Sequence, residues 1–232
     1  MKEISVRLKM LPLAAILSAF LATPASADEI LYANGAGNGQ VNAWPISFGY
    51  SVADQFSLTA PADIVSGFSF LQWVFPGDTP TGVDFSFGTG PWDCTYGCAI
   101  ASTGSFPSFS TSFLGVNQYG YSVYASTVDF KPVGLIGHGG NNLWLTLSSA
   151  TTALGNAAYW DINSGPSNAW ENVFGYLGGG AAQNCNGFGG TCSETFDIIG
   201  HNSTTTPEPS GLLLFGSGLL SLGGILRQKL GM

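Results

Sequence analysis

The sequence predicts an all-β fold, an antiparallel β-sandwich of jelly-roll-like arrangement, for the middle of the chain. Hydrophobic residues recur at every second position in several segments, as in strands with one buried face. In one segment Val83, Phe85 and Phe87 alternate with Asp84 and Ser86. Gly, Pro, Asn and Asp residues separate the segments, and the middle has few of the Lys, Arg and Glu residues that usually cover helix surfaces.

The predicted strands follow one another at short spacing, which is typical of a sandwich. The alternating hydrophobic segments are, in chain order, residues 44–52, 68–75, 83–87, 119–123, 142–147 and 194–199. The first has Trp44, Ile46, Phe48, Tyr50 and Val52 at alternate positions. We expect each segment to form one strand that places its hydrophobic positions on a common face.

The charge distribution excludes one class of function. The chain has 232 residues and a formal net charge of −8. Five of its six cationic side chains lie near the two ends, so the middle carries twelve carboxylates and a single cation, Lys131. Such a surface repels phosphate backbones, and we therefore expect no nucleic-acid binding.

Residues 1–27 have the pattern of a secretory signal peptide. A cationic start is followed by an apolar run over residues 10–22 and by small residues that end in Ala25 and Ala27. The apolar run is short for a membrane span. We predict cleavage after Ala27, which leaves Asp28 as the first residue; an uncleaved anchor is the alternative.

The C-terminal region has three parts in order. Pro207-Glu208-Pro209 comes first, an uncharged stretch over residues 210–226 follows, and Arg227 and Lys229 come last. An apolar stretch of 17 residues is at the lower limit for a transmembrane helix. Cations directly after such a helix hold that end in the cytoplasm. We therefore predict a membrane helix with a basic cytoplasmic tail.

These three parts resemble the PEP-CTERM sorting signal of Gram-negative bacteria. The resemblance implies that Pro207, Glu208 and Pro209 are recognised by an exosortase, a membrane-embedded cysteine protease that cuts near them. It further implies release to the cell envelope or the extracellular space, often in species that make exopolysaccharide. A permanent membrane anchor is the alternative.

The middle of the chain also carries short motifs that point to a group of proteins. They include Asn34-Gly35, Ala43-Trp44, Phe48-Gly49-Tyr50, Phe75-Pro76-Gly77-Asp78, Asn117-Gln118-Tyr119-Gly120-Tyr121, Tyr159-Trp160-Asp161-Ile162-Asn163-Ser164-Gly165 and Ser193-Glu194-Thr195-Phe196. In these the chain looks like exported PEP-CTERM proteins without established activity. The expected organisation is a signal peptide (1–27), a β-sandwich domain (28–202), a linker with the Pro-Glu-Pro motif (203–209), a transmembrane helix (210–226) and a basic tail (227–232).

The four cysteines all lie in the exported part of the chain, where disulfides form. They are Cys94, Cys98, Cys185 and Cys192. Four cysteines allow three pairings, and we favour the local ones, Cys94–Cys98 and Cys185–Cys192. The spacing is loose for a structural zinc site, the competing interpretation.

The sequence contains no catalytic motif. It has two histidines and no metalloprotease motif, phosphate loop or dinucleotide-binding motif, so we predict a non-enzymatic protein without a cofactor. Acidic loop residues have the oxygen ligands that Ca²⁺ prefers, but no calcium-binding motif supports such a site. Asp161 and Glu171 are the candidates for a glycan-cleaving carboxylate pair, the third hypothesis.

Two binding hypotheses remain. The first is a structural or adhesive protein of the cell envelope or extracellular matrix in an exopolysaccharide setting. The second is a carbohydrate-binding module in which tryptophans near breakers stack on sugar rings while polar neighbours bind hydroxyls. Its predicted ligand residues are Trp92, Trp160, Asp161, Asn163 and Trp170.

Overall fold

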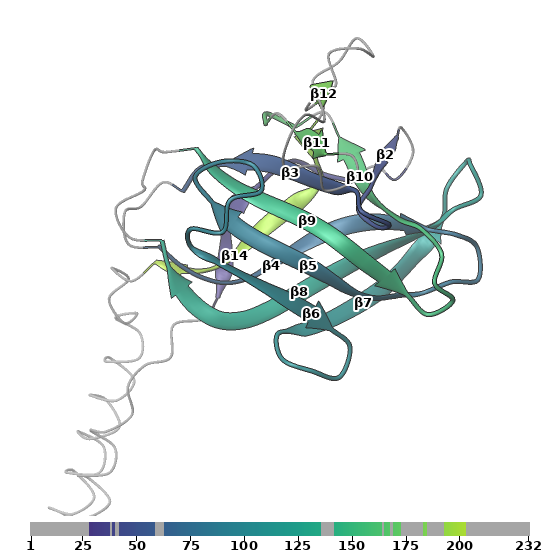
Figure 1. Cartoon of the computed structure of the whole chain (residues 1–232), viewed down its shortest axis with the longest axis horizontal. Helices are drawn as coiled ribbons and strands as arrows, with labels where there is room; N and C mark the ends of the chain where they lie inside the picture. Colours follow the sequence, from purple (N-terminus) through teal and green to yellow (C-terminus); the bar gives the residue numbers. More distant parts are fainter. Residues whose placement is uncertain are drawn as a thin grey trace, which may run out of the picture. The chain divides into compact units, whose positions relative to one another are not determined.

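The computed structural model describes residues 28–37, 39, 42–58, 63–135, 142–163, 165–167, 169–172, 183–184 and 193–202. These residues form β-strands and no helix, and nearly all strand pairs are antiparallel (Figure 1). The all-β prediction is therefore confirmed. The predicted signal peptide, Pro-Glu-Pro linker, membrane helix and basic tail lie outside the described residues. Within the described ranges, no helix has the length and apolar character to cross a membrane.

The described residues form fourteen strands. They are β1 (Glu29–Ala33), β2 (Ala43–Pro45), β3 (Ser51–Phe56), β4 (Asp63–Val74), β5 (Pro80–Gly88), β6 (Gly97–Ser102), β7 (Ser108–Val116), β8 (Ser122–Gly134), β9 (Leu143–Thr152), β10 (Ala158–Asn163), β11 (Trp170–Asn172), β12 (Gln183–Asn184), β13 (Ser193–Glu194) and β14 (Phe196–Asn202). Their hydrogen-bonded order is β1-β14-β4-β8-β7-β6-β5-β9-β3-β11-β12, and β10 pairs with β2, β4 and β13.

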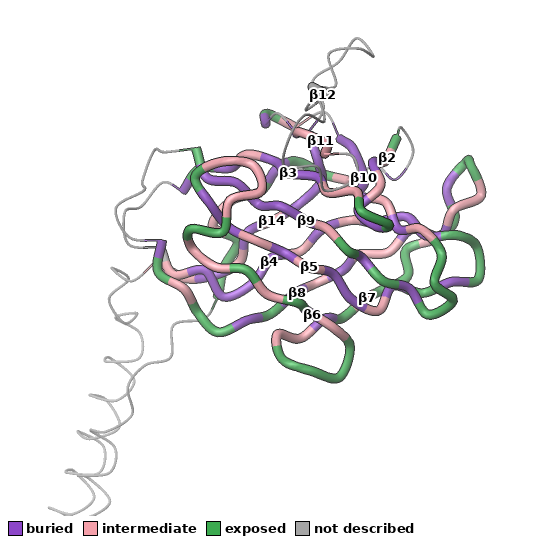
Figure 2. The backbone as a smooth tube through the Cα atoms, viewed as in Figure 1, coloured by how far each residue is buried: buried purple, intermediate pink, exposed green. Residues whose placement is uncertain are grey.

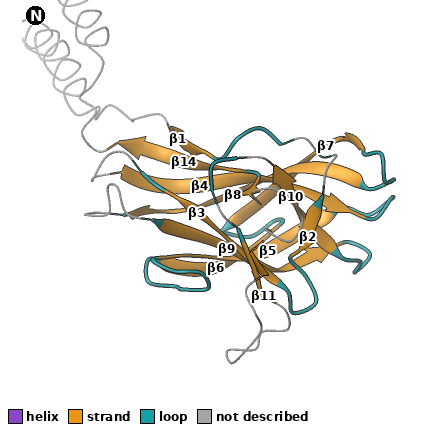
Figure 3. Cartoon of the chain, turned by 90° about the horizontal axis from the view of Figure 1, so that it is seen from above, coloured by secondary structure: helices purple, strands orange, loops and turns teal. Residues whose placement is uncertain are grey.

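The sheet folds over into two layers between β6 and β7, because these strands share only the bridge between Ser102 and Ser108. One layer is β1-β14-β4-β8-β7 and the other is β6-β5-β9-β3-β11-β12. Seen from above, the two groups of strands lie one over the other (Figure 3). The fold is thus sandwich-like, as predicted.

Aromatic side chains fill the space between the layers. Phe68 on β4 lies 5.2 Å from Phe85 on β5, and Phe85 lies 5.2 Å from Phe130 on β8, measured between ring centroids. Phe56 on β3 contacts Phe196 on β14 in the same way, at 6.2 Å. β5 and β3 are not hydrogen-bonded neighbours of these strands, so the ring contacts join the two layers. Buried segments accordingly run through the middle of both layers (Figure 2).

The predicted strand over residues 44–52 is wrong in one respect, because it is two strands. Between β2 and β3 the backbone turns at Phe48 (φ 55°) and Gly49 (φ 87°), and the Tyr50 amide donates to the Ser47 carbonyl at 3.1 Å. Phe48 is therefore exposed rather than buried with Val52. Glycine tolerates positive φ, so Gly49 permits the turn.

Two further predicted strands differ from the observed ones. The segment 119–123 enters β8 only at Ser122, and Tyr119 lies in the turn that joins β7 to β8. The last predicted strand, residues 194–199, is divided at Thr195 between β13 and β14. The first of these differences places an aromatic side chain on the surface.

Candidate functional site

Trp160, one of the predicted ligand residues, belongs to the core. It lies on β10, is fully buried and packs against Phe70 and Phe196 with ring centroids 6.1 and 5.8 Å away. Its indole Nε1 donates to the Thr195 carbonyl at 2.8 Å. The prediction that Trp160 stacks on a sugar is therefore wrong, because neither face of its ring is open to solvent.

Asp161 and Asn163, the next predicted ligand residues, are buried on the same strand. Asp161 Oδ1 accepts from Trp73 Nε1 at 2.7 Å, and Oδ2 accepts from Thr195 Oγ1 at 3.0 Å. Asn163 Nδ2 donates to the Asn34 carbonyl at 2.6 Å. These polar groups bind other parts of the protein, so the prediction that they contact a ligand is corrected as well.

Trp92 and Trp170 both remain partly exposed, and both pack on β9. The Trp92 backbone amide donates to Thr146 Oγ1 at 3.1 Å, and Trp170 makes an edge contact with Trp144 at 6.3 Å. Trp144 and Thr146 are two positions apart on β9, so they point to the same face of their layer. The two tryptophans therefore cover the outer face of the β9 layer.

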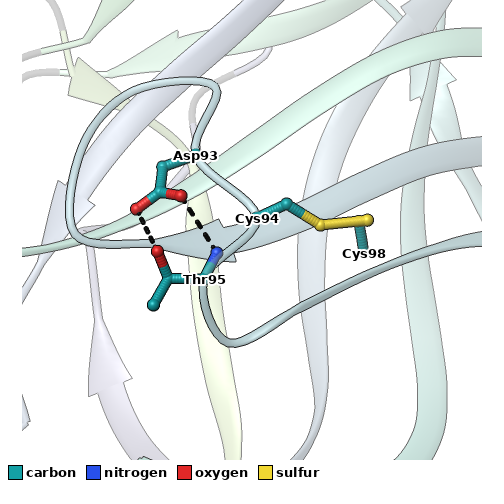
Figure 4. The surroundings of a disulfide bond; sticks show 4 residues. All are labelled: Asp93, Cys94, Thr95 and Cys98. Atoms are coloured by element: carbon teal, nitrogen blue, oxygen red, sulfur yellow. Dashed lines mark hydrogen bonds between the residues drawn. A yellow bond between two sulfur atoms is a disulfide. The ribbon is translucent and has the colours of Figure 1, made fainter.

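The predicted disulfide between Cys94 and Cys98 is confirmed, with the two Cα atoms 5.5 Å apart (Figure 4). Asp93 Oδ1 accepts from the Thr95 amide and Asp93 Oδ2 from the Thr89 amide, both at 3.0 Å. Hydrogen bonds from Thr95 and Thr89 lower the pKa of Asp93 to about 2. The Asp93 carboxylate therefore stabilises the conformation of this loop through hydrogen bonds within it. Cys185 and Cys192 lie outside the described residues.

The described residues include only one position of the predicted processing sites, Asp28. Ser66 Oγ donates to Asp28 Oδ2 at 2.6 Å, and His201 Nδ1 lies 3.0 Å from Asp28 Oδ1. Asp28 thereby contacts β4 through Ser66 and the end of β14 through His201, and β1 and β14 also pair through Glu29 and Gly200. The two ends of the folded unit thus lie side by side. Ala25, Ala27, Pro207, Glu208, Pro209, Arg227 and Lys229 lie outside the described residues.

Four carboxyl groups gather where β3, β10, β11 and β13 meet. Glu194 is fully buried, and neither of its carboxyl oxygens has a hydrogen-bond partner. Burial raises its pKa well above the usual value, and the nearby charges of Asp54, Asp161 and Glu171 act in the same direction. The buried site thus favours the protonated, uncharged form of Glu194.

Asp54 is the hydrogen-bonded centre of this cluster. Burial raises its pKa to about 7, although it accepts hydrogen bonds from the Glu194 amide, Ser167 Oγ and Asn34 Nδ2 at 2.7, 2.8 and 2.9 Å. All four residues are buried. Asp161 is equally buried, so of the candidate carboxylate pair Asp161 and Glu171 only the partly exposed Glu171 reaches solvent.

A cluster of aromatic side chains that includes the exposed Phe75 and Tyr119 lies elsewhere, on the outer face of the β4 layer. Trp73 lies 5.9 Å from Tyr119 and 6.1 Å from Tyr121, while Tyr121 lies 5.3 Å from Phe75 and 5.6 Å from Tyr159. Trp73 is buried beneath the others, whereas Phe75 is 40% and Tyr119 56% exposed. We call these five residues the aromatic surface.

The turn between β7 and β8 positions Tyr119 and Tyr121. Asn117 Oδ1 accepts from the amides of both tyrosines at 3.0 Å, and the Asn117 amide donates to the Tyr121 carbonyl at 2.9 Å. Gly120 has a φ of 86°, which a glycine adopts without strain. The sequence Asn117-Gln118-Tyr119-Gly120 carries Asn and Gly turn signals, so this turn could have been predicted.

An open groove of about 430 Å³ lies on the same layer. Its lining comes from the segment after β1 and from β4, β8 and β14: Ala33, Gly35, Ala36, Gly37, Ser69, Phe70, Leu71, Ala125, Thr195, Phe196 and Asp197. Leu71 and Trp73 are two positions apart on one face of β4, about 7 Å, so the groove adjoins the aromatic surface. A Cβ at residue 37 would overlap the Leu71 side chain, so glycine is required there.

Polar groups line one side of the groove. Ser69 Oγ donates to Asp197 Oδ2 at 3.3 Å across the β4–β14 pair. Partial burial raises the pKa of Asp197, although this hydrogen bond opposes the change. A concave surface of apolar and aromatic side chains with a few polar groups is the usual character of a binding site.

Comparison with known proteins adds no assignment. The chain matches no family model, no curated protein and no solved structure. In the part of the chain that the structure describes, no group of three or more His, Cys, Asp or Glu side chains is arranged to hold a metal ion.

Proposed function

We propose that the protein is exported by its signal peptide and sorted by its PEP-CTERM signal to the cell envelope or extracellular matrix. The proposal rests on Ala25 and Ala27 before the expected cleavage site and on the motif Pro207-Glu208-Pro209 before residues 210–226. The exosortase is the expected processing partner, and the membrane holds the C-terminal helix until cleavage. Residues 28–202 then act outside the cytoplasm.

The folded part acts as a non-enzymatic adhesion domain that binds polysaccharide. The observation that carries this proposal is the aromatic surface, where the half-exposed Tyr119 packs on the buried Trp73 and the partly exposed Phe75 packs on Tyr121. Flat, partly exposed rings offer apolar area at low entropic cost, and a tyrosine adds a hydroxyl group that can hydrogen-bond. Sugar rings present matching apolar faces and hydroxyl edges.

The adjoining groove supplies hydrogen-bonding groups for such a ligand. Ser69, Thr195 and Asp197 line it, beside the apolar Leu71 and Ala125. Twelve carboxylates against the single cation Lys131 disfavour an anionic polysaccharide. The expected ligand is therefore a neutral glycan chain that crosses from the aromatic surface into the groove.

Retention of the full chain on an array of neutral and anionic polysaccharides tests this proposal. The double variant Phe75→Ala/Tyr119→Ala is expected to weaken retention on neutral glycans about tenfold, from aromatic contacts of about 1 kcal/mol. Phe106→Ala, which removes an exposed aromatic ring outside the aromatic surface, is the matched control. Equal retention of wild type and double variant, or binding to no glycan, would contradict the proposal.

Two finer parts of the prediction belong to the same proposal. The jelly-roll-like arrangement of the two layers is one, and a second local disulfide between Cys185 and Cys192 is the other. The intact mass of the exported chain tests the second, since each disulfide lowers the mass by about 2 Da. The same mass reports whether the chain begins at Asp28 and ends near Pro207.

A further inference from the structure

The two edges of the β4 layer differ in how they are protected. β7 pairs along its length with β8, but beyond its bridge to Ser102 it forms no ladder with any other described strand. The backbone donors and acceptors on that side of residues 109–116 are open for pairing. β1, at the opposite edge, begins with the acidic pair Asp28 and Glu29 and has a register irregularity between Ile30 and Tyr32.

β7 has a register irregularity between Phe113 and Gly115, as β1 has between Ile30 and Tyr32, but it lacks the charged residues and prolines that also keep a strand edge from pairing. Its sequence, from Ser108 to Val116, contains no charged residue and no proline. Phe113, Leu114 and Val116 are each more than half exposed. Charged side chains and prolines are what natural edge strands use against association, besides irregularities. The uncharged edge of β7 is therefore suited to binding another strand, with its regular register running up to Phe113.

The chemistry of the rest of the surface indicates which strand that is. With twelve carboxylates and one lysine in the domain, two copies repel each other over most of their surface. The neighbouring strands β6 and β7 are both free of charge, and two copies can approach there without bringing carboxylates together. A strand that pairs with itself in antiparallel orientation also forms a closed two-fold contact.

We infer that β7 is the interface of a homodimer, in which the β7 strands of two copies pair antiparallel and join their β4 layers into one continuous sheet. The two-fold axis of such a pair is perpendicular to the sheet, so both outer faces point to the same side. The inference stands independently of glycan binding. If glycan binding also holds, the dimer presents two aromatic surfaces together, which raises the avidity for a long chain.

Light scattering of the full chain in mild detergent, corrected for bound detergent, measures the mass over a wide range of concentration. The wild type is expected to reach twice the chain mass, and Phe113→Lys/Leu114→Lys to stay at one chain mass. Ile30→Lys is the matched control, because Ile30 is an equally exposed apolar residue at the β1 edge, and it should dimerise like the wild type. A monomeric wild type, a dimeric double variant or a monomeric Ile30→Lys each overturns the inference.

Hydrogen exchange of the wild type provides a test that needs no variant to fold. The amides of residues 109–116 that point away from β8 should exchange more slowly as the protein concentration rises, whereas those of β1 should not change. Exchange in β7 that is independent of concentration overturns the inference. Glycan retention of the monomeric double variant separates the two proposals, because a single aromatic surface still binds, with lower avidity.

Discussion

β10 and the turn between β7 and β8 both combine aromatic side chains with asparagine, yet they place them in opposite surroundings. On β10, Trp160 is fully buried and Asn163 binds the Asn34 carbonyl. In the turn, Tyr119 is 56% exposed and Asn117 binds the tyrosine amides. The first asparagine joins distant parts of the core, whereas the second shapes a loop that presents aromatic rings to solvent.

The difference arises from the neighbours of each segment. β10 pairs with β2, β4 and β13, so other strands flank it on both sides and the opposite layer covers its inner face. The turn follows an edge strand, and no described strand pairs with residues 117–121. An aromatic residue is therefore a core residue or a surface residue according to strand pairing, which is a long-range property.

The largest expected effect is on stability. Trp160→Ala should lower the free energy of unfolding by about 3–5 kcal/mol, because it removes a fully buried ring and leaves a cavity. Tyr119→Ala should change it by less than about 0.5 kcal/mol, as for an exposed residue. Urea unfolding measures both values. Similar losses in the two variants would contradict the division into a buried and an open region.

The second effect is a dependence of stability on pH. Asp54 has a pKa of about 7 in the folded protein against about 3.9 when unfolded. The folded state therefore binds more protons between these values, and stability falls as the pH rises from about 4 to about 7. The raised pKa of Glu194 acts in the same direction. The lowered pKa values of Asp28 and Asp93, which hydrogen bonds cause, act only below about pH 4.

Glu194→Gln checks this pH dependence, because it removes one titrating group without changing its size. We expect urea unfolding at about pH 8 to show a variant that is more stable than the wild type, by on the order of 1 kcal/mol. Tyr119→Ala serves as the control and should keep the slope of the wild type. Stability that rises with pH across the interval would show that these buried carboxyl groups are charged.

A smaller effect is expected at the turn. Asn117→Ala removes the acceptor of two backbone amides and should cost about 1 kcal/mol of stability. It should also weaken glycan retention, because Tyr119 is then held less firmly. Asn117→Asp supplies a carboxylate oxygen in place of the amide Oδ1, so both backbone amides keep an acceptor. This variant should therefore restore retention. Thermal unfolding and the polysaccharide array measure the two effects, and loss of stability without loss of retention would separate the turn from binding.

The smallest expected change in stability is at the groove. Asp197→Asn should alter the free energy of unfolding by less than about 0.5 kcal/mol, since the partly exposed side chain keeps its size and an acceptor oxygen for Ser69. Retention on a neutral glycan should nevertheless fall about two- to tenfold, the value of one hydrogen bond. Unchanged retention in this variant, together with loss in Tyr119→Ala, would limit the binding region to the aromatic surface.

Local patterns predicted those parts of the fold that depend on neighbours in the sequence. The alternation of Val83, Phe85 and Phe87 corresponds to the buried face of β5. Four positions separate Cys94 from Cys98, which allowed their pairing to be predicted from loop length. The same alternation failed at Phe48 and Tyr119, because a positive φ at the following glycine turns the chain and ends the strand.

The sequence by itself determined that this chain is all-β and acidic, since composition and period-two alternation are local properties. It also predicts a targeting segment at each end from terminal motifs. Only the tertiary structure decided which aromatic rings are open. Trp160 and Tyr119 are both aromatic residues close to an asparagine in the sequence. The pairing of β10 with three strands buries Trp160, whereas Tyr119 is exposed because it lies in the turn after an edge strand. Burial depends on which distant strands meet, and no single short segment contains that information.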